Sequence, residues 1–220
     1  MIVRTRMAGD PRPELAGLEI ADPPERWRAL GFAVEQGRLE LGGVEVELGA
    51  AGTDRAHAPP AGDGIVGWTL RHVEAPTAID GLATRATAAP PPPTVTHPNQ
   101  AVAIDHVVVT TPDFDRTAQA LESAGMSLRR IREAGSFRQG FRRLGPAILE
   151  LVEARDAPPG PAAFWGLVVV AEDLEALSAR ISPHLGQIRP AVQPGRLIAT
   201  LADSAGLSPR IAFMDPGPER

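Results

Sequence analysis

The sequence predicts an α+β protein built from paired βαβββ modules that form a cupped mixed sheet, with a reduced version of the same unit at the N-terminus. Two observations support this. The segment after residue 100 contains two similar halves, and a proline-rich stretch, ATAAPPPPTVTHPNQ, precedes them. Hydrophobic residues make up 43% of the 220-residue chain and charged residues 22%, which is typical of a chain with a buried core.

The first half of the repeat begins with an apolar, β-branched stretch at 103–109, which predicts a buried strand. Thr111-Pro112-Asp113 then has the composition of a helix start, and Phe114, Ala118 and Leu121 follow at helical spacing. Three short strand candidates come next: SLRRIRE, SFRQGFRRL and AILELVE.

The second half has the same order of elements. An apolar strand is expected at 165–170, a helix starts at Asp173, and Leu174, Leu177 and Ile181 share one helix face. Aligning residue 113 with residue 173 gives an offset of 60. The strand candidates that follow are GQIRPAV, RLIATLA and RIAFMDP, so each half consists of a strand, a helix and three strands.

The N-terminal part shows the pattern more weakly. LAGLEIADPPERWRALGF predicts a strand and a proline-started helix, and GRLELGGVEVELG predicts a hairpin around Gly42-Gly43. An offset of 103 sets Gly42 against Gly145 and Glu47 against Glu150. GIVGWTLRHVEAPTAIDGLATRA predicts another strand followed by a helix, so we expect one complete unit and one truncated unit.

Four consecutive prolines favour an extended, semi-rigid linker. We therefore divide the chain into a truncated module pair at 1–88, a proline-rich linker at 89–100 and a domain of two βαβββ modules at 101–220. The alternative is a long surface loop within one domain.

Composition excludes several classes of function. The net charge of −5 argues against a nucleic-acid partner, because phosphate binding needs a basic face. Absence of cysteine excludes disulfides and thiolate metal sites, and all 22 basic residues are arginine. There is no apolar run of roughly 20 residues and no apolar stretch at the start, so we expect neither a membrane partner nor a secretory signal, and a cytoplasmic location.

The segments IDHVVVTTPDFDRTAQAL, RLGPAILELVE, GLVVVAEDLEALSARI and PRIAFMDP resemble the vicinal oxygen chelate superfamily, which includes glyoxalase-like and bleomycin-resistance proteins. The resemblance implies that two modules enclose a cavity. It also implies metal ligands on the first and last strands of each module. Carried over by position, these are His106 and Glu150 in one module and Gly166 and Phe213 in the other.

Only two of these four positions hold side chains that could bind a metal. A divalent site normally needs three protein ligands, so we predict no tightly bound metal and no other cofactor. If a metal were bound, His106 and Glu150 would be its ligands. The resemblance also leaves open a metal-dependent lyase, isomerase or dioxygenase that completes its site with water, substrate or another chain.

His106 and Glu150 are the candidate catalytic residues, because imidazole titrates near neutral pH and a carboxylate in the apolar run AILELVE is costly to bury. Either could instead be satisfied by a structural neighbour. Arg142, Trp165 and Phe213 are candidate substrate contacts, although the two aromatic residues could equally belong to the core. The predicted function is binding or transforming a small organic molecule, and a non-catalytic interaction protein is a further alternative. The expected assembly is a monomer or homodimer.

Overall fold

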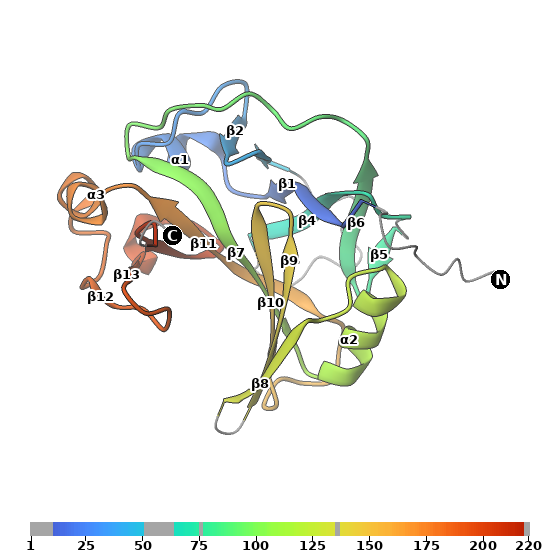
Figure 1. Cartoon of the computed structure of the whole chain (residues 1–220). Helices are drawn as coiled ribbons and strands as arrows, with labels where there is room; N and C mark the ends of the chain where they lie inside the picture. The colour runs from blue at the N-terminus through green and yellow to red at the C-terminus, as the bar shows by residue number, and fades with distance from the viewer. Residues whose placement is uncertain (1–10, 51–63, 75–76, 135–136, 218–220) are drawn as a thin grey trace.

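The computed structural model describes residues 11–50, 64–74, 77–134 and 137–217, which form an α+β protein with two mixed β-sheets (Figure 1). Within these ranges, one sheet has six strands and comes from the N-terminal part, and the other has eight strands and comes from the C-terminal part. None of the helices in the described ranges combines the length and apolar character needed to cross a bilayer.

The C-terminal sheet contains the two predicted βαβββ modules. The first consists of β7 (Ala101–Thr111), α2 (Phe114–Ser123), β8 (Arg130–Ala134), β9 (Phe137–Leu144) and β10 (Ala147–Glu153). The second consists of β11 (Ala163–Ala171), α3 (Leu174–Ile181), β12 (Arg189–Pro190), β13 (Leu197–Thr200) and β14 (Arg210–Met214). The strand order is β12-β13-β14-β11-β7-β10-β9-β8, so β7 and β11 join the modules at the centre.

The internal repeat is confirmed at the level of hydrogen-bond register. Val107 lies directly opposite Leu167 in the antiparallel β7–β11 pair, at the offset of 60 found in the sequence. Both helices begin with the same cap: an Oδ1 of Asp113 accepts from the Arg116 amide at 3.0 Å, and Asp173 accepts from the Ala176 amide at 2.8 Å.

The N-terminal sheet repeats the central arrangement with fewer elements. It consists of β1 (Glu14–Ile20), α1 (Pro24–Ala29), β2 (Arg38–Leu41), β3 (Val44–Leu48), β4 (Ile65–Arg71), β5 (Ala78–Ile79) and β6 (Leu82–Thr87), in the order β2-β3-β1-β4-β6-β5. As in the larger sheet, each module pairs its first and last strands in parallel, and the two first strands pair antiparallel.

The offset of 103 is also confirmed. Leu41 pairs with Val44 across the β2–β3 turn as Leu144 pairs with Ala147 across the β9–β10 turn. The first turn residue is a glycine with a positive φ in both hairpins, 62° at Gly42 and 63° in the C-terminal hairpin, so the two turns share their register and the conformation of that residue.

The prediction of a helix after β4 is wrong. The residues TAIDGLATRA instead form the β5–β6 hairpin, whose turn is Asp80-Gly81. Both turn residues have positive φ values, 46° and 90°. An Asp-Gly pair favours this kind of two-residue turn, and the tight turn prevails over the weak helical spacing around it.

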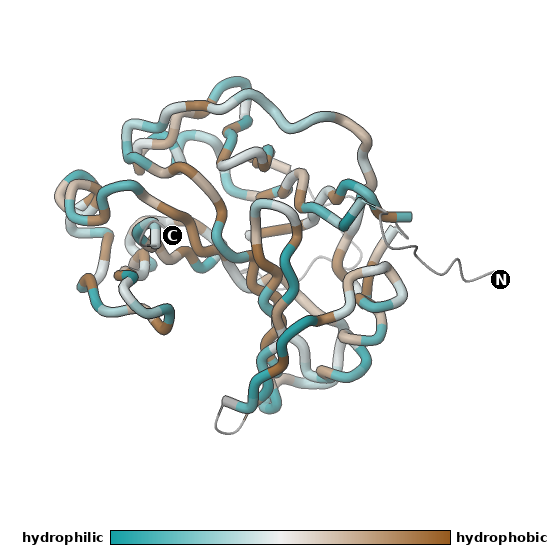
Figure 2. The backbone as a smooth tube through the Cα atoms, in the orientation of Figure 1, coloured by the Kyte–Doolittle hydropathy of each residue, from teal (hydrophilic) through white to brown (hydrophobic). Residues whose placement is uncertain are grey.

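The two sheets share one continuous cluster of buried apolar side chains. Phe32 from the N-terminal part stacks on Phe213 of β14, with ring centroids 6.3 Å apart, and Trp68 of β4 meets Phe164 of β11 at 5.4 Å. Figure 2 shows hydrophobic stretches along the strands where the two sheets meet. The N-terminal sheet therefore packs against one face of the larger sheet, which we call the core face.

The segment between β6 and β7 has no regular strand or helix and runs as the green arc over the N-terminal sheet in Figure 1. Hydrogen bonds attach this segment to the N-terminal part of the chain. The Val95 amide donates to a Glu40 carboxylate oxygen at 2.9 Å, and His97 Nε2 lies 2.6 Å from the Glu40 carbonyl oxygen. Nδ2 of the Asn99 side chain donates to the Leu30 carbonyl oxygen at 3.0 Å. The division of the chain at 88 and 101 stays a prediction.

Candidate functional site

The site lies on the face of the C-terminal sheet opposite the core face, which we call the open face. It is defined by side chains that alternate with the buried core positions. These are His106 and Val108 on β7, Gln139 and Phe141 on β9, Glu150 on β10, Val168 on β11 and Ala212 on β14. Their intervening neighbours, including Val107, Leu149, Leu167 and Ile211, belong to the shared apolar cluster.

His106 is held in place by its chain neighbour Asp105. The register between β7 and β11 shifts at this point, so that Val168 pairs with His106 but Val169 pairs with Ile104. The side chain of His106 is only 6% exposed, and its Nδ1 lies 2.5 Å from an Asp105 carboxylate oxygen. These two atoms complete no hydrogen bond of acceptable geometry among the described residues, so we treat the contact as electrostatic.

Asp105 also binds an arginine that is distant in sequence. Arg196 Nη1 donates to Asp105 Oδ1 at 2.7 Å, and its Nε and Nη2 donate to the Asp215 carbonyl at 2.9 and 2.6 Å. Burial raises the pKa of Asp105, but contacts with His106 and Arg196 outweigh it and lower the pKa to about 2. An ionised Asp105 thus ties the β12–β13 connection to the strand that carries His106.

Glu150 is half-buried and faces the same side of the sheet as His106. Gln139 Nε2 donates to Glu150 Oε1 at 2.9 Å. Burial raises the pKa of Glu150, and coulombic interactions with His106 and Arg132 partly oppose that rise. The net upward shift increases the fraction of Glu150 that is protonated near neutral pH.

Phe141 contacts both His106 and Arg132. It is the cross-strand partner of Glu150. Its ring meets the His106 imidazole in an edge-to-face arrangement, with centroids 6.5 Å apart. The guanidinium carbon of Arg132 lies over the same ring, 5.5 Å from its centroid. The open face therefore places an imidazole, a carboxyl group and a guanidinium around one aromatic side chain.

The three predicted substrate contacts do not join this group. Arg142 lies on the core face, 7% exposed, and its Nη1 donates to the Ser127 carbonyl at 3.3 Å. Phe213 is fully buried against Phe32 on the same core face. Trp165 is 51% exposed at a shift in the β11–β7 register.

The register also corrects one alignment. Val108 pairs with Glu150 in the first module, and its counterpart Val168 pairs with Ala212. Ala212, and not Phe213, therefore takes the place of Glu150 in the second module. The sequence motif assigned this last-strand position to Phe213, one residue beyond Ala212. An error of one residue moves the assigned side chain to the other face of the strand.

The residues present do not fit the divalent ion that the family resemblance implies. Ala212 carries no donor atom, and Gly166 cannot be replaced by a ligand in this backbone because a Cβ there would lie 2.1 Å from the Arg210 carbonyl oxygen. In the parts of the chain that the structure describes, no group of three or more His, Asp or Glu side chains could hold a metal ion.

Sequence reasoning missed Asp105, Phe141 and Arg196. Phe141 could have been found by counting back from Glu150 across the hairpin turn at Gly145, because cross-strand partners are symmetric about a turn. Arg196 could not have been found in this way. It is 91 residues from Asp105 and lies in a connection between two short strands.

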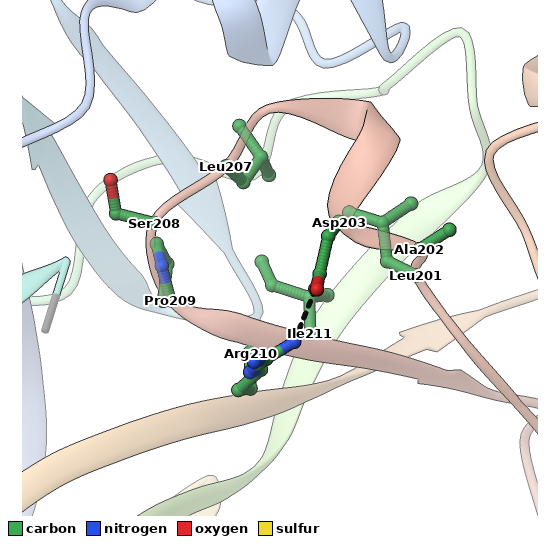
Figure 3. Close-up of a pocket in the computed structure, with 8 residues that line it drawn as sticks. All are labelled: Leu201, Ala202, Asp203, Leu207, Ser208, Pro209, Arg210 and Ile211. Atoms are coloured by element: carbon green, nitrogen blue, oxygen red, sulfur yellow. Dashed lines mark hydrogen bonds and ion pairs between the residues drawn. The ribbon is translucent and has the colours of Figure 1, made fainter. Parts of the chain in front are cut away.

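Two surface pockets lie away from this group. One, of about 230 Å³, is lined by Leu201, Ala202, Asp203, Leu207, Ser208, Pro209, Arg210 and Ile211, and an Asp203–Arg210 ion pair spans it (Figure 3). The other, of about 330 Å³, is lined by Phe137 and residues 153–157. Neither contains His106 or Glu150.

No protein-family model matches the sequence, and no curated protein matches it significantly. Solved structures with similar folds include methylmalonyl-CoA epimerase from Mycobacterium tuberculosis, with 18% identity, a TM-score of 0.44, and coverage of 54% of this chain and 91% of that one. A variant of the Streptomyces coelicolor epimerase in complex with 2-nitronate-propionyl-CoA has 15% identity, a TM-score of 0.43 and coverage of 52% and 94%. A hypothetical protein from Bacillus halodurans has 13% identity, a TM-score of 0.43 and coverage of 53% and 96%. Similarity of this strength carries no argument about ligand or reaction.

Proposed function

We propose that the open face of the C-terminal module pair binds a small organic molecule, and that His106 and Glu150 exchange protons with it. The observation that carries this proposal is the placement of an almost buried imidazole and a carboxyl group of raised pKa on one face of adjacent parallel strands. Perturbed titratable groups gathered in this way are typical of functional sites.

The two groups are suited to different roles. Asp105 lies against Nδ1 of His106, which leaves Nε2 to face a ligand as a proton acceptor. Glu150 is hydrogen-bonded by Gln139 and shifted toward its neutral form, so it can donate a proton. The valine and alanine side chains around them supply an apolar surface for the rest of the molecule.

A thermal-shift screen of small organic molecules, run with and without divalent ions, tests the proposal. A ligand present at 100 times its Kd stabilises the folded state by about 2.7 kcal/mol, which gives a measurable rise in Tm. We expect the rise to be lost in His106→Ala and Glu150→Gln. Glu47→Gln is the matched control, because Glu47 has the same register position in the N-terminal sheet and should leave the rise unchanged.

Metal analysis of the purified protein provides the second test. We expect no stoichiometric divalent metal, because the equivalents of His106 and Glu150 in the other module are Gly166 and Ala212. Finding about one equivalent of zinc, iron, manganese or nickel that disappears in His106→Ala would overturn this view and favour a metal-dependent lyase, isomerase or dioxygenase.

A further inference from the structure

We propose that the ligand of the open face is an amphipathic oxyanion, a carboxylate or phosphate on a short apolar chain, and that Arg132 binds its charged group. This inference rests on the proposed function and specifies the class of molecule. It comes from a guanidinium that stacks on an aromatic ring of the site and forms no hydrogen bond or ion pair among the described residues.

Arg132 differs from the other half-buried arginines of this module pair. Arg138 forms ion pairs with Asp115 and Glu153, and Arg196 binds Asp105. Arg132 stacks on Phe141 and, among the described residues, makes no hydrogen bond and no ion pair. Its five N–H donors are therefore available in a planar arrangement that matches a carboxylate or phosphate.

The charges of the open face also favour an anion. Besides Arg132, two further arginines lie opposite open-face positions: Arg130 opposite Phe141 and Arg143 opposite Ile148. Of the acidic groups on this side, Asp105 is already bound to Arg196, and Glu150 forms no ion pair among the described residues. An anion placed at Arg132 would meet a surplus of positive charge.

The remaining surface of the open face is apolar. Val108, Val152, Val168 and Ala212 extend from the first module across β7 into the second. A ligand whose oxyanion binds Arg132 would therefore direct its chain past Glu150 and His106 toward these side chains. The acid–base pair would then face the carbon atoms next to the charged group.

Calorimetric titration of the full chain with hexanoate, hexyl phosphate and hexanamide tests the inference. Each probe has six carbon atoms, and the three differ in the head group: a carboxylate, a phosphate or a neutral amide. We expect at least one anion to bind about tenfold or more tightly than the neutral amide, which is the contribution of a charge-assisted hydrogen-bonded pair. Preference for hexanoate would identify a carboxylate ligand, and preference for hexyl phosphate a phosphate ligand.

Three variants locate the effect. Arg132→Gln should abolish the preference for anions, and Arg132→Lys should restore part of it, because lysine keeps the charge but not the planar pair of donors. Arg12→Gln removes the same charge from an exposed residue before β1 and should leave the preference intact. Equal affinity of all three probes for the native chain, absence of binding by both anions at millimolar concentration, or a preference that survives Arg132→Gln would overturn the inference.

The outcome is distinguishable from failure of the proposed function. Screening hits that depend on His106 and Glu150 but are uncharged and insensitive to Arg132→Gln would retain the site and reject the anion. If binding of every hit were unaffected by His106→Ala and Glu150→Gln, the site itself would be rejected.

Discussion

The two sheets of this protein share a framework but differ at the positions that carry chemistry. Four first-strand positions are equivalent by register, one per module, and they hold Gly17, Gly67, His106 and Gly166. Three of the four modules therefore have no side chain where the first C-terminal module has an almost buried imidazole. The comparison indicates that the strand framework is common to all four modules and that only the first C-terminal module carries a polar side chain at this position among the described residues.

Charge compensation differs between the sheets in the same way. On the N-terminal sheet Glu19 forms an ion pair with Arg85 at 2.9 Å, from the strand two positions away in the sheet. On the C-terminal sheet, Glu150 accepts only from Gln139 among the described residues, and Arg132 forms no hydrogen bond or ion pair there, although its charge acts on Glu150 at longer range. Glu19 is thus compensated by an ion pair within its own sheet, whereas neither Glu150 nor Arg132 forms an ion pair among the described residues.

We expect the largest change in the free energy of unfolding from a substitution in the interface between the two sheets. Phe213→Ala removes a fully buried ring that stacks on Phe32 of the other part, and should lower the free energy of unfolding by about 3–5 kcal/mol. Urea unfolding followed by tryptophan fluorescence and by far-UV circular dichroism should show one shifted transition for both probes.

Two separate unfolding transitions in the native chain would contradict this prediction, because they would mean that the two sheets unfold independently. Val192→Ala is the control. Val192 is 83% exposed, so its truncation should change the free energy of unfolding by less than about 0.5 kcal/mol.

A second prediction compares two equivalent glycines. Gly166→Ala would bring a Cβ to 2.1 Å from the Arg210 carbonyl oxygen, whereas a Cβ at Gly67 would have its nearest contact at 3.3 Å, the Ala83 carbonyl oxygen. We expect Gly166→Ala to destabilise the fold by about 1–3 kcal/mol, as overpacking does, and Gly67→Ala to cost clearly less. Equal costs in urea unfolding would show that the close approach of β11 and β14 does not distinguish the two sheets.

Much of the fold could be predicted because the repeats carry their register in the sequence. The offset of 103 followed from Gly42 and Gly145, which occupy the same turn position, and the offset of 60 followed from two aspartate caps. The β5–β6 hairpin was missed because a two-residue turn between very short strands leaves little periodic signal.

The site was predicted less completely. His106 and Glu150 do share a face, whereas strand parity places Arg142 and Phe213 on the core face, away from them. A sequence motif shows which strand a residue belongs to. The face of the sheet on which its side chain lies depends on the strand register, which shifts at irregularities such as the one beside Asp105. Contacts between distant segments, such as Asp105 with Arg196, leave no local pattern at all.

The smallest predicted effect concerns the pH dependence of stability. Burial raises the pKa of both Glu150 and Glu19 in the folded protein above the ordinary value of a glutamate side chain. The folded state then binds more protons than the unfolded state, so each group lowers stability as pH rises through and above its unfolded pKa. Glu150→Gln removes this loss, so the variant should become more stable relative to the native chain between about pH 4 and pH 7, and Glu19→Gln provides the comparison.

The two variants should differ in size because their compensating charges differ. Glu19 has a direct ion pair with Arg85, which its glutamine variant would lose, so its gain at neutral pH should be small or absent. Glu150 has no ion pair among the described residues, and glutamine can still accept from Gln139, so Glu150→Gln should show the larger gain. Urea unfolding of the three proteins at several pH values measures the difference, and a larger gain for Glu19→Gln would contradict the assignment of the uncompensated charge to the C-terminal sheet.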